Sequence, residues 1–174
     1  MEEFDSDEFD SPVASVHRGA GIRIEKTVII NRSAHELFTF WREFENLPRF
    51  MTHLDSVKII DARRSHWVVK GPAGLHYEWE AEIHNEKPDE LIAWRSTYGE
   101  INHAGSVRFK SLPEGAGTEV IVELRYEPPA GKLGELFAKL AGEEPVQQVE
   151  EDLNRFKEVM ESPGTLPPAD SPSV

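Results

Sequence analysis

The chain has 174 residues, a length typical of one domain, and it contains no cysteine, which excludes a disulfide framework, a cysteine zinc site and a thiol nucleophile. Its formal net charge of -13 disfavours contact with phosphate backbones and anionic membranes, so we expect no nucleic-acid partner. No apolar run reaches the roughly 18 residues of a membrane-spanning helix, and we expect a cytoplasmic protein without stable membrane insertion.

The two ends of the chain are expected to lie outside the folded domain. Residues 1–20 are rich in Asp and Glu, which favours a disordered acidic tail. This acidic start also differs from a secretory signal, which would be basic and then apolar. Residues 163–174 are rich in proline and predict a second disordered tail. The folded domain is therefore expected over residues 21–162.

The first half of the domain is predicted to begin with a strand and two short helices. The segment 22–30, IRIEKTVII, places Ile and Val on one face of a strand. Ser33 and Glu36 have the spacing of a capping box at the start of a helix. A second short helix is expected to begin near Pro48. Six further strands, separated by turn signals that favour antiparallel hairpins, are expected at 56–61, 66–71, 75–83, 91–97, 102–110 and 118–126.

The last part of the domain is predicted to be helical. Residues 131–144 form a first helical segment that Gly142 and Pro145 interrupt. Residues 145–162 then predict a long helix with an apolar stripe, while Asp152 lies away from that stripe. A helix with one apolar face needs a partner, which the strands supply. The fold class is therefore predicted to be α+β, with a seven-stranded curved antiparallel sheet around a long C-terminal helix.

One predicted strand, LHYEWEAEI at 75–83, has two unlike faces. Its apolar face carries two large aromatic residues with polar atoms, Tyr77 and Trp79. Such a face either covers a packed core or lines a cavity, and the alternation alone does not decide between the two. Gly105, inside a later strand, marks either a bend or a space above the sheet.

The sequence offers no complete metal or cofactor motif. HELFT at 35–39 begins like a zinc-protease helix, but Thr39 stands where the second histidine ligand is required. EGAGTE at 114–119 joins two strands and precedes no helix, so a hairpin turn is favoured over a phosphate loop. We therefore expect no metal and no cofactor.

Four segments carry a resemblance to a known superfamily: SAHELFTFWREFENLPRFMTHL, LIAWRSTYGEINHAGSVRFK, GTEVIVELRYEPPAGKLGELFAKL and PVQQVEEDLNRFKEVMES. With the order of the elements, they resemble the START/Bet v 1-like (SRPBCC) superfamily, in its branch of bacterial polyketide cyclases/dehydrases and coenzyme Q-binding proteins, over residues 22–161. The resemblance implies a helix-grip fold, with a cavity between the concave sheet face and the last helix. It also implies that the short helices flank the mouth of that cavity.

The implied cavity and the strand alternation together give the candidate ligand-binding residues. Phe50 and Met51 are expected to form a movable lid rather than deep core. Trp67 is expected to matter less, because its strand is nearer the sheet edge by chain order. The wall residues are expected to be Tyr77, Trp79, Trp94, Ser96, His103, Leu153 and Phe156.

Three functions remain open at this point. We favour a non-catalytic carrier or sensor of a hydrophobic small molecule such as a lipid, quinone, isoprenoid or polyketide. The alternative is a cyclase/dehydratase-like enzyme, in which His103 is the catalytic candidate because an unshifted imidazole titrates near neutral pH. The second alternative is a protein-interaction module that docks a protein partner through the acidic tail or through a helix face.

Overall fold

A computed structural model describes residues 22–71, 74–99, 101–127 and 145–164. The acidic tail predicted for 1–20, the helical segment predicted for 131–144 and most of the proline-rich tail predicted for 163–174 lie outside these residues. Within the described ranges, no helix combines the length and the apolar character needed to cross a membrane.

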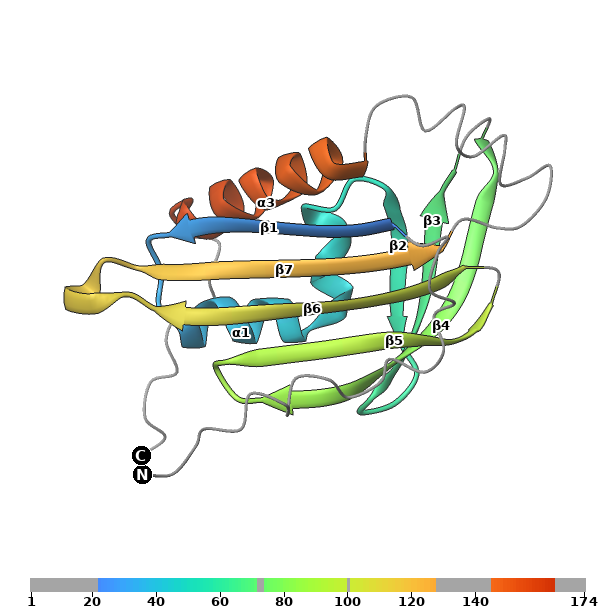
Figure 1. The fold of residues 1–174 in the computed structure, drawn as a ribbon, viewed down its shortest axis with the longest axis horizontal. Helices are drawn as coiled ribbons and strands as arrows, with labels where there is room; N and C mark the ends of the chain where they lie inside the picture. Colours follow the sequence, from blue (N-terminus) through green and yellow to red (C-terminus); the bar gives the residue numbers. More distant parts are fainter. Residues whose placement is uncertain (1–21, 72–73, 100, 128–144, 165–174) are drawn as a thin grey trace.

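The element order in the described residues is a strand, two short helices, five strands, a one-turn 3₁₀ helix, the last strand and a long helix (Figure 1). The helices are α1 (Ala34–Arg42), the 3₁₀ helices η2 (Phe44–Arg49) and η4 (Pro113–Gly115), and α3 (Pro145–Glu161). The strands are β1 (Ile22–Ile30), β2 (Leu54–Ile59), β3 (Arg64–Lys70), β4 (His76–Lys87), β5 (Leu91–Gly99), β6 (Asn102–Ser111) and β7 (Thr118–Glu127).

All seven strands form one antiparallel sheet in the order β1-β7-β6-β5-β4-β3-β2. The strands from β2 to β7 pair with their neighbours in sequence, whereas β1 pairs with the last strand, from Ile22 opposite Tyr126 to Ile30 opposite Thr118. Register shifts interrupt the pairing of β4 with β5 and of β2 with β3, and such bulges bend a sheet. In Figure 1, β2, β3 and β4 accordingly stand upright beside the other strands. The predicted fold class is confirmed.

Two local predictions need correction. β4 continues to Lys87, beyond the strand end predicted at Ile83. The second short helix does not begin near Pro48 but contains it, as a 3₁₀ helix over Phe44–Arg49. Its backbone bonds run from Asn46 to Glu43 and from Phe50 to Leu47, so neither uses the N–H that proline lacks.

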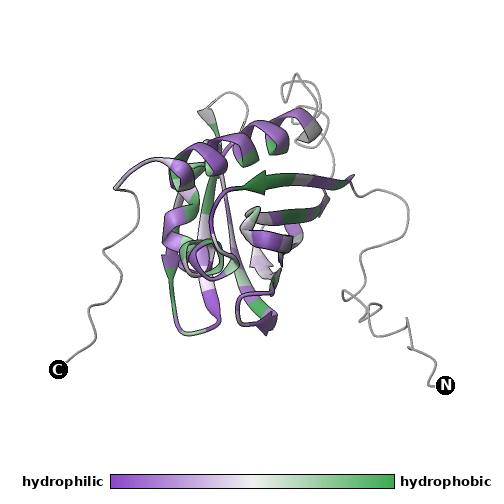
Figure 2. Cartoon of the chain, turned by 90° about the vertical axis from the view of Figure 1, so that its left-hand side faces the viewer, coloured by the Kyte–Doolittle hydropathy of each residue, from purple (hydrophilic) through white to green (hydrophobic). Residues whose placement is uncertain are grey.

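The start of α1 and the buried face of α3 both agree with the sequence prediction. Ser33 caps α1, and the side chain of Glu36 bonds back to the Ser33 amide, which completes the capping box. On α3, Val149, Leu153 and Phe156 are buried against the sheet. Figure 2 shows the outer side of α3 as mainly hydrophilic. The helix therefore covers the concave face with its apolar stripe.

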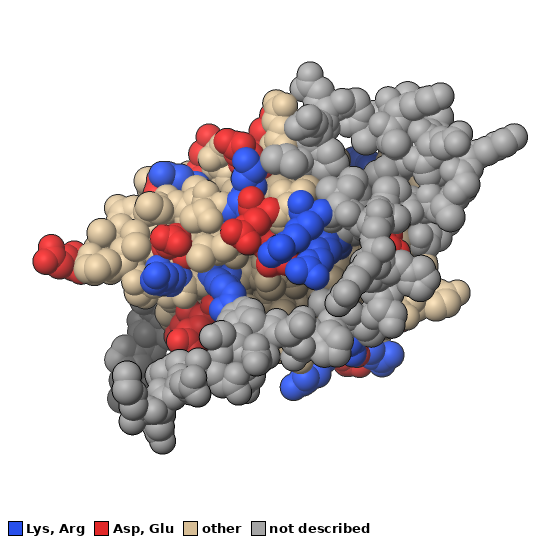
Figure 3. All heavy atoms as spheres, in the orientation of Figure 1, with Lys and Arg blue, Asp and Glu red and all other residues tan. Residues whose placement is uncertain are grey.

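The face of the sheet opposite α1 carries charges of both signs (Figure 3). Arg23 lies 3.1 Å from Glu123, and Arg95 lies 2.7 Å from Glu82, across neighbouring strands. Exposed ion pairs of this kind contribute roughly 0–1 kcal/mol each to stability. They therefore mark this side of the sheet as facing solvent and add little to the stability of the fold.

Candidate functional site

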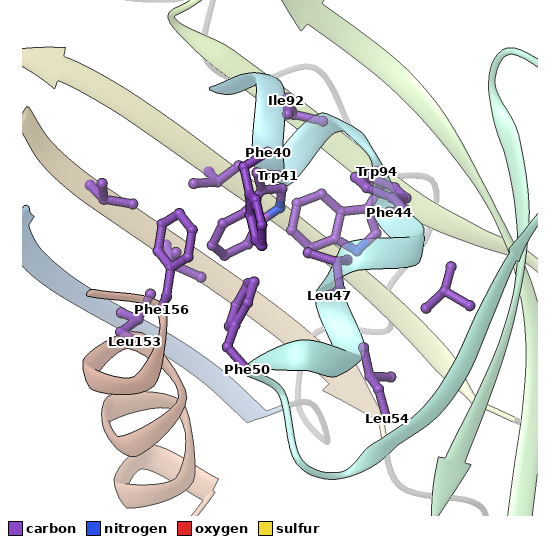
Figure 4. Packing of buried hydrophobic residues seen from close by; sticks show 14 of the residues in the cluster. Phe40, Trp41, Phe44, Leu47, Phe50, Leu54, Ile92, Trp94, Leu153 and Phe156 are labelled. Atoms are coloured by element: carbon purple, nitrogen blue, oxygen red, sulfur yellow. The ribbon is translucent and has the colours of Figure 1, made fainter. Parts of the chain in front are cut away.

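Aromatic residues fill the concave face beneath α1, η2 and α3. The ring of Phe50 lies 4.7 Å from that of Phe156 and 5.2 Å from that of Trp41, and the rings of Trp41 and Phe156 are 5.2 Å apart. Figure 4 shows Phe156 pointing from α3 towards Phe40 and Phe50. We call Phe40, Trp41, Phe50 and Phe156 the aromatic core.

The expectation that Phe50 is a lid rather than core is wrong. Its exposed fraction is 0%, and it lies inside the aromatic core. The reason is local, because the 3₁₀ helix ends at Arg49 and the next residue turns inward onto α3. Met51 is partly buried and packs against the outside of the hydrophobic core.

A second group of rings lies further along the same face, on four neighbouring strands. We call Trp67, Trp79, Trp94 and His103 the ring cluster. Trp67 lies 5.6 Å from Trp79 and 6.2 Å from Trp94 between ring centres, with interplanar angles of 27° and 21°. The imidazole of His103 lies 5.5 Å from Trp79, 6.1 Å from Trp67 and 6.4 Å from Trp94. The expectation that Trp67 is peripheral is therefore not supported by its position, since it contacts the other three rings.

Strand register explains why these rings meet. Trp67 lies directly opposite Trp79 across β3 and β4, and Trp94 lies opposite Gly105 across β5 and β6. A Cβ atom on Gly105 would lie 2.4 Å from the nearest atom of the Trp94 indole, so glycine is what lets that indole lie across β6. His103 is two residues before Gly105 and so shares its face. The sequence left open whether Gly105 marks a bend or a space above the sheet; the structure shows the Trp94 indole above it.

Three polar atoms of the ring cluster are buried without a hydrogen-bond partner among the residues that the structure describes. They are Nε1 of Trp79, Nε1 of Trp94 and Nδ1 of His103. The fourth ring differs, because Nε1 of Trp67 donates to Oγ of the buried Ser65 at 2.8 Å. A buried polar group without a partner costs about 1–3 kcal/mol, so such groups call for an explanation.

The imidazole of His103 is neutral at physiological pH. Burial lowers its pKa to about 4, and no neighbouring charge contributes to that shift. Its backbone N–H donates to Oγ of Ser96 at 3.0 Å, and that hydroxyl donates to Oδ1 of Asn102 at 3.3 Å. Ser96 therefore orients the hairpin that carries His103.

The remaining predicted residues lie in the hydrophobic core around these two groups. Tyr77 is 4% exposed and leans over Gly71, where an added Cβ would lie 2.3 Å from its ring. Leu153 and Phe156 reach the hydrophobic core from α3. The structure thus brings Trp79, Trp94 and His103 together, while Phe50, Leu153 and Phe156 lie in another part of the same continuous hydrophobic core.

One contact between α3 and the segment after η2 was not anticipated from the sequence. Arg155 donates from Nε to the backbone oxygen of Phe50 at 3.0 Å and pairs with Asp152. The side chain of Asp152 is only 14% exposed, although the apolar stripe predicted it in solvent. Burial raises the pKa of this carboxyl, while the Arg155 guanidinium opposes the rise. The i, i+3 spacing of Asp152 and Arg155 was the available signal.

A curled antiparallel sheet that holds a long C-terminal helix defines the helix-grip class of START-like proteins. Residues 30–154 match the sequence family described as "Polyketide cyclase / dehydrase and lipid transport". The chain belongs to this family, which confirms the superfamily resemblance seen in the sequence.

Individual relatives agree with this assignment. An uncharacterized 17.2 kDa protein of Streptomyces lincolnensis is 29% identical over 144 residues, covering 82% of this chain and 91% of the relative. A crystal structure from Deinococcus radiodurans is 39% identical with a TM-score of 0.67, covering 80% of this chain and 97% of the other. The structure of the Zhui aromatase/cyclase from Streptomyces sp. R1128 has a TM-score of 0.61 and covers 79% of this chain and 92% of the Zhui chain. Because its sequence is only 16% identical, this similarity supports the fold alone.

Proposed function

We propose that the protein binds one hydrophobic small molecule between the concave sheet face and α3, as a carrier or sensor. Family membership supports a hydrophobic ligand, because the family description includes lipid transport. The ring cluster supports the place, because it combines large apolar surfaces with a few polar atoms, as small-molecule sites usually do.

The observation that carries the proposal is the set of three buried ring nitrogens without a partner. Each of them lowers stability as long as it has no partner, and within the described residues Nε1 of Trp41 in the aromatic core has the same status. What distinguishes the ring cluster is that three such nitrogens lie on contacting rings. A bound ligand that supplies the missing partners offsets this cost. Since the nitrogens are buried in the present state, binding requires neighbouring side chains to move apart.

A second candidate function, a cyclase or dehydratase, is favoured by one observation only. His103 is an imidazole inside the proposed site, and imidazole is a common proton carrier in catalysis. Its low pKa means that at neutral pH it can accept a proton only as a weak base, and that the imidazolium form, which would act as the general acid, is scarcely populated. This property favours the carrier over the enzyme.

The test of binding is a titration of the purified protein with N-phenyl-1-naphthylamine, an uncharged probe whose fluorescence rises in apolar sites. Saturable binding at one site is expected, and native mass spectrometry should show the complex at one probe per chain. Binding that never saturates, together with the absence of any complex, would overturn the proposal.

The test between carrier and enzyme is His103→Phe. A carrier should keep its probe affinity within about tenfold, because one neutral hydrogen bond has a small net value. An enzyme that moves a proton through His103 should lose roughly 10²–10⁴ in rate on its substrate while still binding it.

A further inference from the structure

We infer that the ligand of the ring cluster is an uncharged, ring-bearing molecule that presents carbonyl oxygen to Trp79 and Trp94, and that carboxylates such as fatty acids are excluded. This inference rests on the proposed function and specifies the ligand class of the same site. It comes from the hydrogen-bonding capacity, the charge and the ring geometry of the cluster.

The hydrogen-bonding capacity calls for acceptors. An indole N–H can only donate, and both Trp79 and Trp94 have theirs buried and without a partner among the described residues. A ligand carbonyl accepts such bonds and carries no donor of its own. A carbonyl oxygen has two lone pairs, so one such oxygen can accept from both indoles, while Nδ1 of His103 is left to a second polar group of the ligand. Carbonyl oxygen therefore matches the two indole donors of the cluster.

The charge of the surroundings excludes carboxylates. Among the described residues no charged group contributes to the pKa of His103, and burial holds that imidazole neutral. Arg155, on α3, is already paired with Asp152 and bonded to the Phe50 carbonyl. Moving a carboxylate from water into such a site without a counter-charge is strongly unfavourable, whereas an uncharged carbonyl can exchange water for the two indole donors.

The ring geometry favours a ligand that has a ring of its own. Trp94 lies at 21° to Trp67 and at 29° to His103, so neighbouring rings are close to parallel. A flat ligand that enters between such rings stacks on them with offset contacts, which add to the burial of apolar area. A flexible acyl chain would gain the burial alone.

Three naphthalenes with one skeleton separate these effects: 2-acetonaphthone has a carbonyl, 2-ethylnaphthalene has no acceptor, and 2-naphthoate is an anion. Isothermal titration at pH 7.5 should give a dissociation constant for the ketone about 2- to 10-fold lower than for the hydrocarbon. Binding of 2-naphthoate should be at least about 100-fold weaker than that of the ketone.

Two variants test the donors named above. Trp79→Phe and Trp94→Phe keep a ring but remove the N–H, so each should reduce the preference for ketone over hydrocarbon. Trp41→Phe is the matched control, because its Nε1 is also buried without a described partner and its ring belongs to the aromatic core; of the ring cluster it contacts Trp94, at 6.4 Å between ring centres. This control should leave the preference unchanged. Near-ultraviolet circular dichroism confirms that each variant is folded.

Each outcome decides the question. Equal affinity for ketone and hydrocarbon, tight binding of naphthoate, or a preference that survives in both tryptophan variants would overturn the inference. If N-phenyl-1-naphthylamine binds saturably while none of the three naphthalenes does, the ligand class is wrong and the proposed function stands. If neither the probe nor the three naphthalenes bind, the proposed function itself fails.

Discussion

Replacement of Phe50 by alanine tests whether the residue after η2 is core or lid. Phe50 is 0% exposed, and its ring lies 4.7 Å from that of Phe156. Burial of about 200 Å² at roughly 25 cal/mol per Å² corresponds to about 5 kcal/mol as an upper value. Measured Phe→Ala losses in cores are about 3–5 kcal/mol, so we expect a loss in this range.

The assay is urea unfolding followed by far-ultraviolet circular dichroism, with thermal melting as a second measure. For a chain of this size, the expected loss lowers the melting temperature by roughly 6–20 °C. Tyr98→Ala is the control, because Tyr98 is 78% exposed and should change stability by less than about 0.5 kcal/mol. A loss below about 1 kcal/mol for Phe50→Ala would refute the core placement and restore the lid.

Three further changes have defined outcomes. Gly105→Ala places a Cβ 2.4 Å from the Trp94 indole, so overpacking should cost about 1–3 kcal/mol in urea unfolding and alter tryptophan fluorescence. Arg155→Met removes the guanidinium that pairs with the largely buried Asp152, so the free energy of unfolding at pH 7 should fall by about 1–3 kcal/mol. Because burial raises the pKa of the Asp152 carboxyl, this destabilisation should shrink as the pH falls towards 4 and the carboxyl is protonated. His103 has a folded pKa of about 4 against 6.5 unfolded, so the folded protein loses stability as the pH falls between these values. His103→Phe should remove about 2 kcal/mol of the loss between pH 7.5 and 5, measured by urea unfolding at both pH values.

Each of these three changes has a result that would contradict its prediction, and Gly105→Ala also has a matched control. Ser106→Ala, on the same strand, should be nearly neutral, and equal effects at 105 and 106 would show that Gly105 does not make room for Trp94. If the difference in free energy of unfolding between Arg155→Met and the unmodified protein grows as the pH falls, Asp152 is not a buried carboxyl paired with Arg155. An unchanged acid profile for His103→Phe would show that the imidazole is solvated.

The strands and the capping box could be predicted because they depend on near neighbours in sequence. Alternation with period two located the strands, and the Ser33–Glu36 spacing located the start of α1. The pairing of β1 with β7 joins residues about a hundred positions apart, so no local pattern contains it. The helix stripe likewise predicted which residues of α3 are buried by the sheet.

Two residues show what local patterns miss. Chain order predicts Trp67 on a strand near the sheet edge, and β3 is indeed next to the edge strand β2, but the Trp67 ring still contacts Trp79, Trp94 and His103. Asp152 lies off the apolar stripe of α3, but the segment after η2 covers it, so that it is largely buried. Both outcomes depend on how distant elements are packed, which periodicity along one element does not describe.

The most direct test of ligand binding at the ring cluster is a ¹H–¹⁵N correlation spectrum of the four indole N–H groups during titration with 2-acetonaphthone. Single Trp→Phe variants assign the signals. We expect the signals of Trp79 and Trp94 to move saturably and together, in the direction of stronger hydrogen bonding, while Trp67, already bonded to Ser65, moves less. Saturable binding that leaves the Trp79 and Trp94 signals in place would contradict binding of the ketone by these two indoles.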